Sequence, residues 1–220
     1  MERQQTSTSI KTKTIQSPYD YYAIYKSVLA KGEEIFGPGF EIDDIDRPVI
    51  MRLITYFLQD ESVATDQDID LYKGLLITGP IGCGKTAIMQ IINALLPQEK
   101  KYIVRSCRSI SMDYIADGHE TIRRYTTDSF ELYSKKPKTV YFDDVGCEHD
   151  VNHWGNLNNV METILLLRYE SFMDFHMQTY ISTNLSSTEL EVKYGPRVRS
   201  RLRQMCQLIA FSTESKDKRK

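Results

Sequence analysis

The stretch GPIGCGKT, Gly79 to Thr86, decides the fold. It fits the pattern G-x-x-x-x-G-K-[ST] at every fixed position, with an apolar strand-like segment before it and a helix-like segment after it. Glycines let the backbone N–H groups of such a loop turn inward around phosphate oxygens, and the N-terminus of the following helix adds partial positive charge. The loop therefore predicts a phosphate-binding site at the end of a buried strand.

We expect ATP to contact nine consecutive residues of this loop and of the helix that follows. They are Gly79, Pro80, Ile81, Gly82, Cys83, Gly84, Lys85, Thr86 and Ala87. The Lys85 ammonium group is expected to reach the β- and γ-phosphates, and the Thr86 hydroxyl is expected to ligate Mg²⁺. Cys83 occupies a variable position of the pattern, where a tolerated small side chain is favoured over a redox switch.

The stretch TVYFDDVGCE, residues 139–148, is an apolar segment that ends in paired carboxylates. In a parallel sheet the carboxyl end of such a strand lies beside the phosphate loop, which is the Walker B arrangement. Asp143 is expected to hold Mg²⁺ through its hydration shell. Asp144 is expected to orient or deprotonate the attacking water, with Glu148 as a substitute.

A third apolar strand, QTYISTN at residues 178–184, delivers Thr183 and Asn184 to the same edge of the sheet. A polar side chain at that edge can sense the γ-phosphate or position a water molecule. It can equally be an ordinary residue of the turn that ends the strand. The sequence alone leaves these two interpretations open.

The whole chain alternates apolar strands with helices, a pattern that indicates a parallel sheet covered on both faces. Strands are predicted at 71–79, 101–107, 139–145, 178–184 and 206–212. Helices are predicted at 18–37, with Ser17 as the N-cap, and at 49–61, 85–97, 109–126, 156–175 and 187–205. Residues 1–17 are polar and predicted to be disordered, and residues 213–220 form a basic tail.

Composition adds limits to the possible classes of protein. The chain has 220 residues, a formal net charge of −2 and four cysteines. The cysteines are scattered without a CxxC pair, which favours a reduced, cytoplasmic setting. No apolar run is long enough for a signal peptide or a membrane span, so no membrane association is expected. The overall charge gives no reason to expect nucleic-acid binding, but basic residues concentrate after Lys193.

The densest group of these basic residues lies in YGPRVRSRLR, residues 194–203. Pro196 suits a helix start, and winding the segment at 100° per residue gathers Val198, Leu202 and Met205 into one buried stripe. The arginines then divide into two pairs on opposite flanks, Arg197 with Arg201 and Arg199 with Arg203. Arg201 lies nearest to the apolar stripe, which favours a partly buried and oriented guanidinium group.

The order of these motifs, together with LLLRYE, STNLS and YGPRVRSRL, resembles the AAA+ ATPases, among them the DnaC helicase loaders and IstB transposition helpers. The resemblance covers residues 38–212. It implies a five-stranded parallel sheet in the order 5-1-4-3-2 without a C-terminal lid domain, and a ring or spiral of subunits with ATP between them. By position, Asn184 matches sensor 1. Arg201 matches an arginine finger supplied to the next subunit's γ-phosphate, with Arg197 as second choice.

The same resemblance implies a role in DNA replication or mobile-element transactions, with a replicative helicase or a transposase as client. Single-stranded DNA is a further expected partner, through basic residues at Arg123, Arg124, Lys135, Lys136 and Lys138. Two alternatives remain: a nucleotide-gated adaptor with negligible hydrolysis, and a small P-loop kinase. GTPase and ABC-type signatures are absent. A metal site at Cys147, His149 and His153 is conceivable, but surface histidines are favoured.

Overall fold

The computed structural model describes residues 17–148, 151–153 and 156–219. The predicted disorder of residues 1–16 therefore lies outside the described part of the chain. The helices are α1 (Tyr21–Phe36), α2 (Arg47–Leu58), α3 (Glu61–Asp66), α4 (Lys85–Leu95), a 3-10 turn (Gln98–Lys100), α5 (Cys107–Asp117), α6 (His119–Tyr125), α7 (Val160–Phe175) and α8 (Ser187–Met205). The strands are β1 (Gly74–Thr78), β2 (Ile103–Ser106), β3 (Val140–Asp143), β4 (Val151–His153), β5 (Asn156–Asn158), β6 (Thr179–Thr183) and β7 (Cys206–Ala210).

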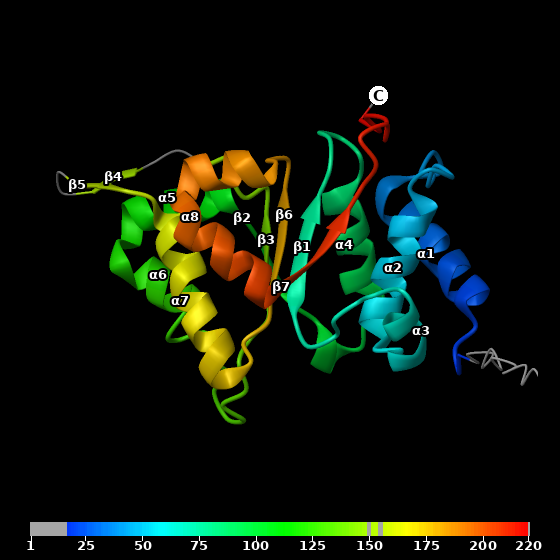
Figure 1. The fold of residues 1–220 in the computed structure, drawn as a ribbon, viewed down its shortest axis with the longest axis horizontal. Helices are drawn as coiled ribbons and strands as arrows, with labels where there is room; N and C mark the ends of the chain where they lie inside the picture. Colours follow the sequence, from blue (N-terminus) through cyan, green and yellow to red (C-terminus); the bar gives the residue numbers. More distant parts are fainter. Residues whose placement is uncertain (1–16, 149–150, 154–155, 220) are drawn as a thin grey trace, which may run out of the picture.

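Five strands form one parallel sheet in the order β2-β3-β6-β1-β7. Counted along the chain as strands one to five of this sheet, the order is 5-1-4-3-2, so the predicted topology is confirmed. Because all five strands are parallel, the carboxyl ends of β1, β3 and β6 meet at one edge (Figure 1). That edge receives the residues that follow each of these three strands.

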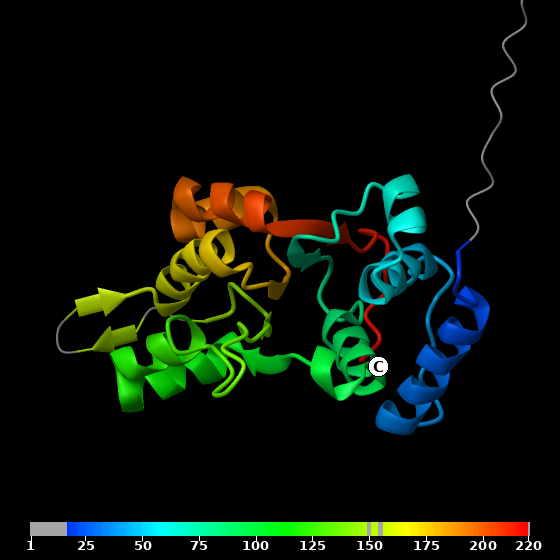
Figure 2. The ribbon, with the colours of Figure 1, turned by 90° about the horizontal axis from the view of Figure 1, so that it is seen from below.

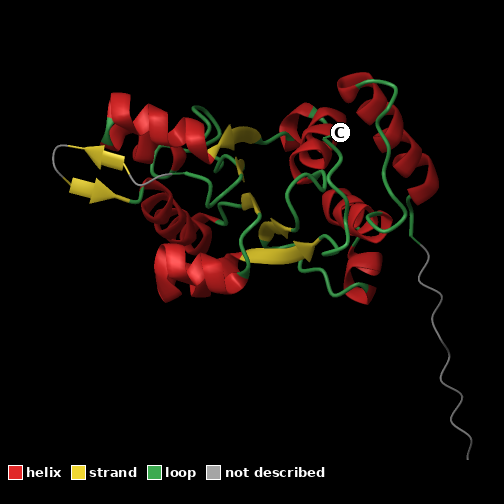
Figure 3. Ribbon diagram, turned by 90° about the horizontal axis from the view of Figure 1, so that it is seen from above, coloured by secondary structure: helices red, strands yellow, loops and turns green. Residues whose placement is uncertain are grey.

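Helices cover both faces of the sheet, as the continuous apolar character of the strands predicts. Helices α1, α2 and α4 pack on one face, and α5, α6, α7 and α8 pack on the other (Figures 1 and 3). Successive side chains of β3 point to opposite faces of the sheet, so this strand contributes to two hydrophobic cores. Tyr141 belongs to the first core, with α1, α2 and α4, whereas Val140 and Phe142 belong to the second core, with α5, α6, α7 and α8. The helix that follows the phosphate loop and the helix that carries the arginines are thus separated by the sheet.

Several predicted helices differ from the observed ones in their bounds. The helix predicted at 156–175 begins only at Val160, because the Asn159 side chain accepts the backbone N–H of Glu162 at 3.0 Å and caps it. Residues 156–158 instead form β5, which pairs with β4 in a hairpin that the sequence did not predict and that projects from the body (Figure 3). The segment 109–126 is divided into α5 and α6 at Gly118, whose φ is 58°.

The first helix also starts later than predicted. It begins at Tyr21, and its N-cap is Asp20, whose carboxylate accepts the backbone N–H of Ala23 at 3.0 Å. The predicted cap, Ser17, instead donates its hydroxyl to Asp60 at 2.5 Å. That contact ties the start of the described chain to the α2–α3 junction, and α1 then runs along the outer side of the molecule (Figure 2).

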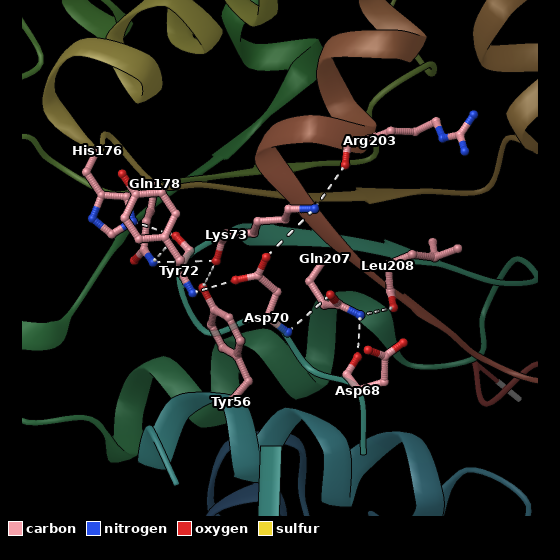
Figure 4. Close-up of polar contacts among 10 residues, drawn as sticks. All are labelled: Tyr56, Asp68, Asp70, Tyr72, Lys73, His176, Gln178, Arg203, Gln207 and Leu208. Carbon is pink, nitrogen blue, oxygen red and sulfur yellow. Dashed lines mark hydrogen bonds and ion pairs between the residues drawn. The ribbon is translucent and has the colours of Figure 1, made fainter. Parts of the chain in front are cut away.

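Contacts from three other elements fix the segment that leads into β1 (Figure 4). Tyr72 stacks on His176 at the end of α7, with ring centroids 3.7 Å apart. The Lys73 ammonium group lies 3.4 Å from the carbonyl oxygen of Arg203 in α8. On the β7 side, the Gln207 side chain accepts from the backbone N–H of Asp70 at 3.3 Å. The strand that delivers the phosphate loop is therefore held at its beginning from both sides.

A buried arginine ties the second core to the sheet. Arg168 in α7 is 0% exposed. Its guanidinium group donates to Thr179 Oγ1 at 2.7 Å and to the carbonyl oxygens of Tyr125, Lys138 and Gln178 at 2.7, 3.2 and 2.7 Å. This residue belongs to the LLLRYE motif, and its role in the structure is to join α7 to β6 and to the two segments before β3.

Within the described residues, none of the helices combines the length and the apolar character that crossing a lipid bilayer requires.

Candidate nucleotide-binding site

The phosphate loop connects β1 to α4 by a turn that only glycine adopts without strain. Gly82 and Gly84 have φ values of 78° and 100°. Gly84 is the N-cap of α4, so the helix starts at Lys85 with its first backbone N–H groups directed at the loop. The predicted loop between a buried strand and a helix is thus present, with the geometry that favours anions.

The Lys85 ammonium group lies inside this loop, and the side chain is 5% exposed. It donates to the carbonyl oxygens of Gly79 at 2.9 Å and Pro80 at 2.8 Å, and to Asn184 Oδ1 at 2.6 Å. The contact with Asn184 joins the end of β6 to the phosphate loop. The structure therefore brings together two residues that are 99 positions apart in the chain.

Asp143 lies at the centre of a group of hydroxyl donors. Thr86 Oγ1 is 2.9 and 3.1 Å from the two carboxylate oxygens of Asp143. The hydroxyl groups of Tyr141 and Ser182 each donate to Asp143 Oδ1 at 2.6 Å. A carboxylate beside a hydroxyl is an oxygen donor set that suits Mg²⁺. Thr86 and Asp143 would hold that ion, as the sequence predicts, whereas Tyr141 and Ser182 carried no sequence signal.

Asp144 follows in a left-handed conformation with a φ of 56°. Its backbone N–H donates to Ser182 Oγ at 2.9 Å, and its carboxylate accepts from Asn184 Nδ2 at 3.4 Å. Asn184 thus contacts both Lys85 and Asp144. Such a bridging position favours the sensor interpretation over that of an ordinary turn residue.

Glu148, the predicted substitute for Asp144, is only 4% exposed and already has partners. Its carboxylate accepts from the backbone N–H of Gly146 at 2.9 Å and from the Tyr194 hydroxyl. The Lys193 ammonium group lies 3.8 Å from the same carboxylate. A carboxylate with these partners is less available to a water molecule than Asp144.

The arginines lie on α8, on the face of the sheet opposite to α4. The Arg201 guanidinium group stacks over the Tyr169 ring at 4.2 Å from the centroid. Arg197 and Arg201 line a groove of about 270 Å³, whose other walls include Glu162, Leu166 and Glu170 of α7. The predicted division holds, because Arg199 instead pairs with Glu191 at 2.5 Å and Arg203 is exposed.

The C-terminal segment, residues 212–219, folds back onto the phosphate loop. The backbone N–H of Lys218 donates to the Gly82 carbonyl oxygen at 3.0 Å. Its ammonium group contacts Asp46, which is 0% exposed and also accepts from Ser215 Oγ at 2.5 Å. A Cβ atom on Gly82 would lie 1.9 Å from a carboxylate oxygen of Asp217. From the sequence, residues 213–220 were predicted only as a basic tail, and this contact was not predicted.

The basic residues expected to contact DNA differ in their surroundings. Arg123 pairs with Glu120 at 3.6 Å and Asp128 at 3.0 Å, and Arg124 pairs with Asp117 at 2.8 Å. Lys135, Lys136 and Lys138 have no acidic partner within the described chain. They lie in a compact loop, residues 129–138, whose tip exposes Leu132 by 72% and Tyr133 by 93%.

Two cysteine predictions have different outcomes. Cys83 is 0% exposed, and burial raises the pKa of its thiol, which keeps the sulfur protonated and fits a small packed side chain. His149 lies outside the described residues, and the side chain of His153 is not described. Among the side chains that are described, no group of three or more potential ligands forms a metal site.

Solved structures and family models identify the fold. A structure of the DnaC helicase loader matches with a TM-score of 0.51 and 15% identity, over 80% of this chain and 95% of that one. A structure of DnaI matches with a TM-score of 0.51 and 18% identity, over 79% and 88% of the two chains. At these identities the likeness shows the fold. The search of curated proteins returned no match.

The model of the AAA domain family matches residues 54–196, which is more than half of the chain and contains the phosphate loop, both carboxylates and Asn184. The resemblance to AAA+ proteins is thereby confirmed, the solved structures show the same fold, and the chain belongs to the AAA domain family.

Proposed function

We propose that this protein binds and hydrolyses ATP as an AAA+ ATPase that acts in DNA replication by helicase loading, or in mobile-element DNA transactions. The observation that carries the proposal is the convergence of Lys85, Thr86, Asp143, Asp144 and Asn184 at one edge of the sheet. Replication is favoured because the solved structures that share this fold include the DnaC helicase loader and DnaI. The client would be a replicative helicase or a transposase, and the setting cytoplasmic.

The residues have distinct proposed roles in ATP hydrolysis. Gly79 to Ala87 bind the phosphates, and Lys85 exchanges its carbonyl partners for the β- and γ-phosphates. Thr86, and Asp143 through water, would hold Mg²⁺, which would neutralise phosphate charge. Asp144 accepts the proton of the water that attacks the γ-phosphorus, and Asn184 orients that water. The products are ADP and inorganic phosphate.

Arg201 is proposed to act on the nucleotide of a neighbouring subunit. It lies across the sheet from its own α4, in a groove of α7 and α8, and its guanidinium group is oriented by Tyr169. A guanidinium group delivered to the γ-phosphate stabilises the charge of the transition state. The assembly would be a ring or spiral.

Mixed subunits test this proposal. Lys85→Ala subunits lose the ammonium group that reaches the phosphates but keep Arg201, and Arg201→Ala subunits are the converse. Each variant alone is expected to lose at least about tenfold in ATPase rate, and mixing them is expected to restore activity. Arg197→Ala is compared on the same flank, because Arg197 is the second choice for this role, and it is expected to retain the activity that Arg201→Ala loses. If mixing restores nothing while both variants fold and assemble, Arg201 does not act in trans.

The same measurements separate the alternatives. A nucleotide-gated adaptor would bind ATP but show negligible hydrolysis in every mixture. A P-loop kinase would transfer phosphate to a small acceptor, at a rate per subunit independent of protein concentration. The domain boundaries, with residues 38–212 as the AAA+ unit after the N-terminal helix, are part of the proposal.

Single-stranded DNA is proposed to bind at the 129–138 loop. Its lysines have no acidic partner among the described residues, and Tyr133 offers an exposed aromatic ring for stacking on a base. Tyr133→Ala is expected to weaken binding of an oligonucleotide by about tenfold. Arg123→Ala is the control, because this arginine is already paired with acids. Equal effects of the two substitutions would remove this loop from the proposal.

A further inference from the structure

Helix α8, which carries the arginines, is broken at Gly195, directly before Pro196. Gly195 has φ 82° and ψ 165°, which are not helical values, and Pro196 provides no backbone N–H to continue the hydrogen-bond ladder. A Cβ atom on Gly195 would meet nothing within 4 Å. The direction of residues 196–205, named here the arginine half-helix, is therefore set by side-chain contacts at and after the break.

One of these contacts is a buried hydrogen bond directly before the break. Tyr194 is 2% exposed, and its hydroxyl donates to Glu148 Oε1. Burial and the negative charge of Glu148 raise the pKa of Tyr194, so the phenol stays protonated and remains a donor. The neighbouring Lys193 ammonium group lies 2.8 Å from the carbonyl oxygen of Glu148. Glu148 is thus the anchor to which α8 attaches at its break.

Glu148 in turn ends a tightly held turn that starts at Asp144, the proposed catalytic carboxylate. Within residues 144–148, named here the carboxylate turn, Asp144 and Gly146 have φ values of 56° and 105°. The Val145 N–H donates to the Ser182 carbonyl oxygen at 2.8 Å. A Cβ atom on Gly146 would lie 2.4 Å from Leu185. Because this turn has little freedom, the position of Glu148 is fixed relative to that of Asp144.

We propose that Tyr194 is a positioning residue for Arg201: its hydrogen bond to Glu148 holds the arginine half-helix at a fixed angle to the carboxylate turn. Tyr194 does not touch the nucleotide, and it acts on the neighbouring subunit's ATP only through Arg201. This inference rests on the proposed function of Arg201 in trans. It also gives Glu148 a structural role in place of the catalytic one considered from the sequence.

The test uses subunits that contribute nothing but their arginine. Donor subunits carry Lys85→Ala and are mixed with Arg201→Ala acceptor subunits, and a second mixture uses donors with both Lys85→Ala and Tyr194→Phe. The first mixture is expected to restore hydrolysis, and the second to restore about tenfold less, because a misplaced catalytic group costs rate steeply. Since the donor does not hydrolyse ATP, an effect of Tyr194 on its own carboxylates cannot produce this difference.

The two proposals fail in different ways. Failure of the first mixture, with both variants folded and assembled, overturns the role of Arg201 in trans and this inference with it. Equal restoration by the two mixtures overturns the role of Tyr194 alone. The acceptor's affinity for a fluorescent ATP analogue is expected to be the same in both mixtures, because Tyr194 is altered only in the donor.

Two further kinds of donor subunit, each also carrying Lys85→Ala, control for a general loss of stability in the donor. Tyr102→Phe removes a hydroxyl that is also buried, at 5% exposure, and that donates to the Met89 carbonyl oxygen at 2.5 Å, on the face of the sheet opposite to α8. It is expected to restore hydrolysis fully, and a loss equal to that of Tyr194→Phe overturns the inference. Gly195→Ala strains the break without a steric contact and is expected to impair donation, so it carries the test if Tyr194→Phe does not fold.

Discussion

Arg168 is a charged residue that is fully buried beside the core of α5, α6, α7 and α8. Burial lowers the pKa of its guanidinium group to about 9, and its partners are one hydroxyl and three carbonyl oxygens without a carboxylate. Arg168→Met is expected to lower the free energy of unfolding by about 3 kcal/mol, since it leaves buried carbonyl oxygens unpaired. Urea denaturation measures this loss.

The matched control is Arg199→Met, which breaks the partly exposed pair with Glu191. Its effect on the free energy of unfolding is expected to stay below about 1 kcal/mol. Similar losses for both variants would show that the hydrogen bonds of Arg168 add nothing beyond its packing.

Ser182 is the residue that links the two carboxylates, since its hydroxyl donates to Asp143 and accepts from the backbone N–H of Asp144. Ser182→Ala is expected to weaken ATP binding in Mg²⁺ by about tenfold, because loss of a residue that orients a metal ligand costs metal affinity. Titration with a fluorescent ATP analogue in Mg²⁺ and in EDTA measures this. An equal loss in EDTA would contradict a role that acts through Asp143.

Among single residues, the sequence predicted those that stand at fixed positions of a motif or directly after an apolar strand. Lys85 and Thr86 sit at fixed positions of a loop, and Asp143 and Asn184 follow apolar strands, so each could be placed at the edge before the structure was known. Ser182 and Tyr141 lie inside strands, where a hydroxyl is indistinguishable from an ordinary core or strand residue. Their role appears only when neighbouring strands are in register.

Among the elements, α1 and the residues before it are joined to the α2–α3 junction by the Asp60 carboxylate, which accepts from Ser17 and Tyr21. Burial alone would raise the pKa of Asp60, but hydrogen bonds from Ser17, Ser62, the Val63 backbone and Tyr21 outweigh it and lower the pKa to about 2. A carboxyl group whose pKa is lower in the folded state stabilises the fold above its unfolded pKa, which is 3.8, and this stabilisation is lost as the pH falls toward 2.

Asp60→Asn is therefore expected to remove on the order of 2 kcal/mol of stability at neutral pH, and to make unfolding less dependent on pH between 4 and 2. Acid denaturation of the two proteins, followed by circular dichroism, checks the slope. Parallel acid profiles for Asp60→Asn and the unaltered chain would assign that dependence to other carboxyl groups.

The C-terminal segment is the other element with a measurable influence on the site. It carries the Asp217 carboxylate to the proposed phosphate-binding loop, while the charge of Lys218 is offset by Asp46 and Asp43. Lys218→Met is expected to release the segment and to raise affinity for ATP severalfold, by removing a negative charge from the loop. Fluorescence titration measures the change.

Lys216→Met is the control, since Lys216 is exposed and has no polar partner in the described part of the chain. It is expected to leave affinity for ATP unchanged. A decrease for Lys218→Met would mean that the segment belongs to the binding surface instead of opposing the ligand.

Across the whole molecule, the sheet order followed from the sequence through the resemblance, and the structure confirms it. The hairpin β4–β5 was not predicted because three-residue strands carry too short an alternating pattern to be separated from the start of a helix. The break in α8 was predicted only in part. Pro196 indicated a helix start, but the residues before it also have a helical pattern, so one helix was predicted over residues 187–205.

Assembly into an oligomer is a property of the whole molecule. If Arg201 completes a neighbouring site, the ATPase rate per subunit is expected to rise with protein concentration and then to level off as assembly saturates. Light scattering under the same conditions reports the assembled fraction. A rate per subunit that stays constant while the assembled fraction rises would contradict a shared site.

The sheet places α4 on one face and the arginine half-helix on the other, so the proposed phosphate site and the proposed arginine finger belong to opposite faces of each molecule. Head-to-tail contacts of this kind close into a ring or continue as an open helix. An open assembly always leaves one phosphate loop without an arginine and one arginine without a nucleotide. The terminal subunits of a spiral would therefore differ in chemistry from all the others, although every chain is identical.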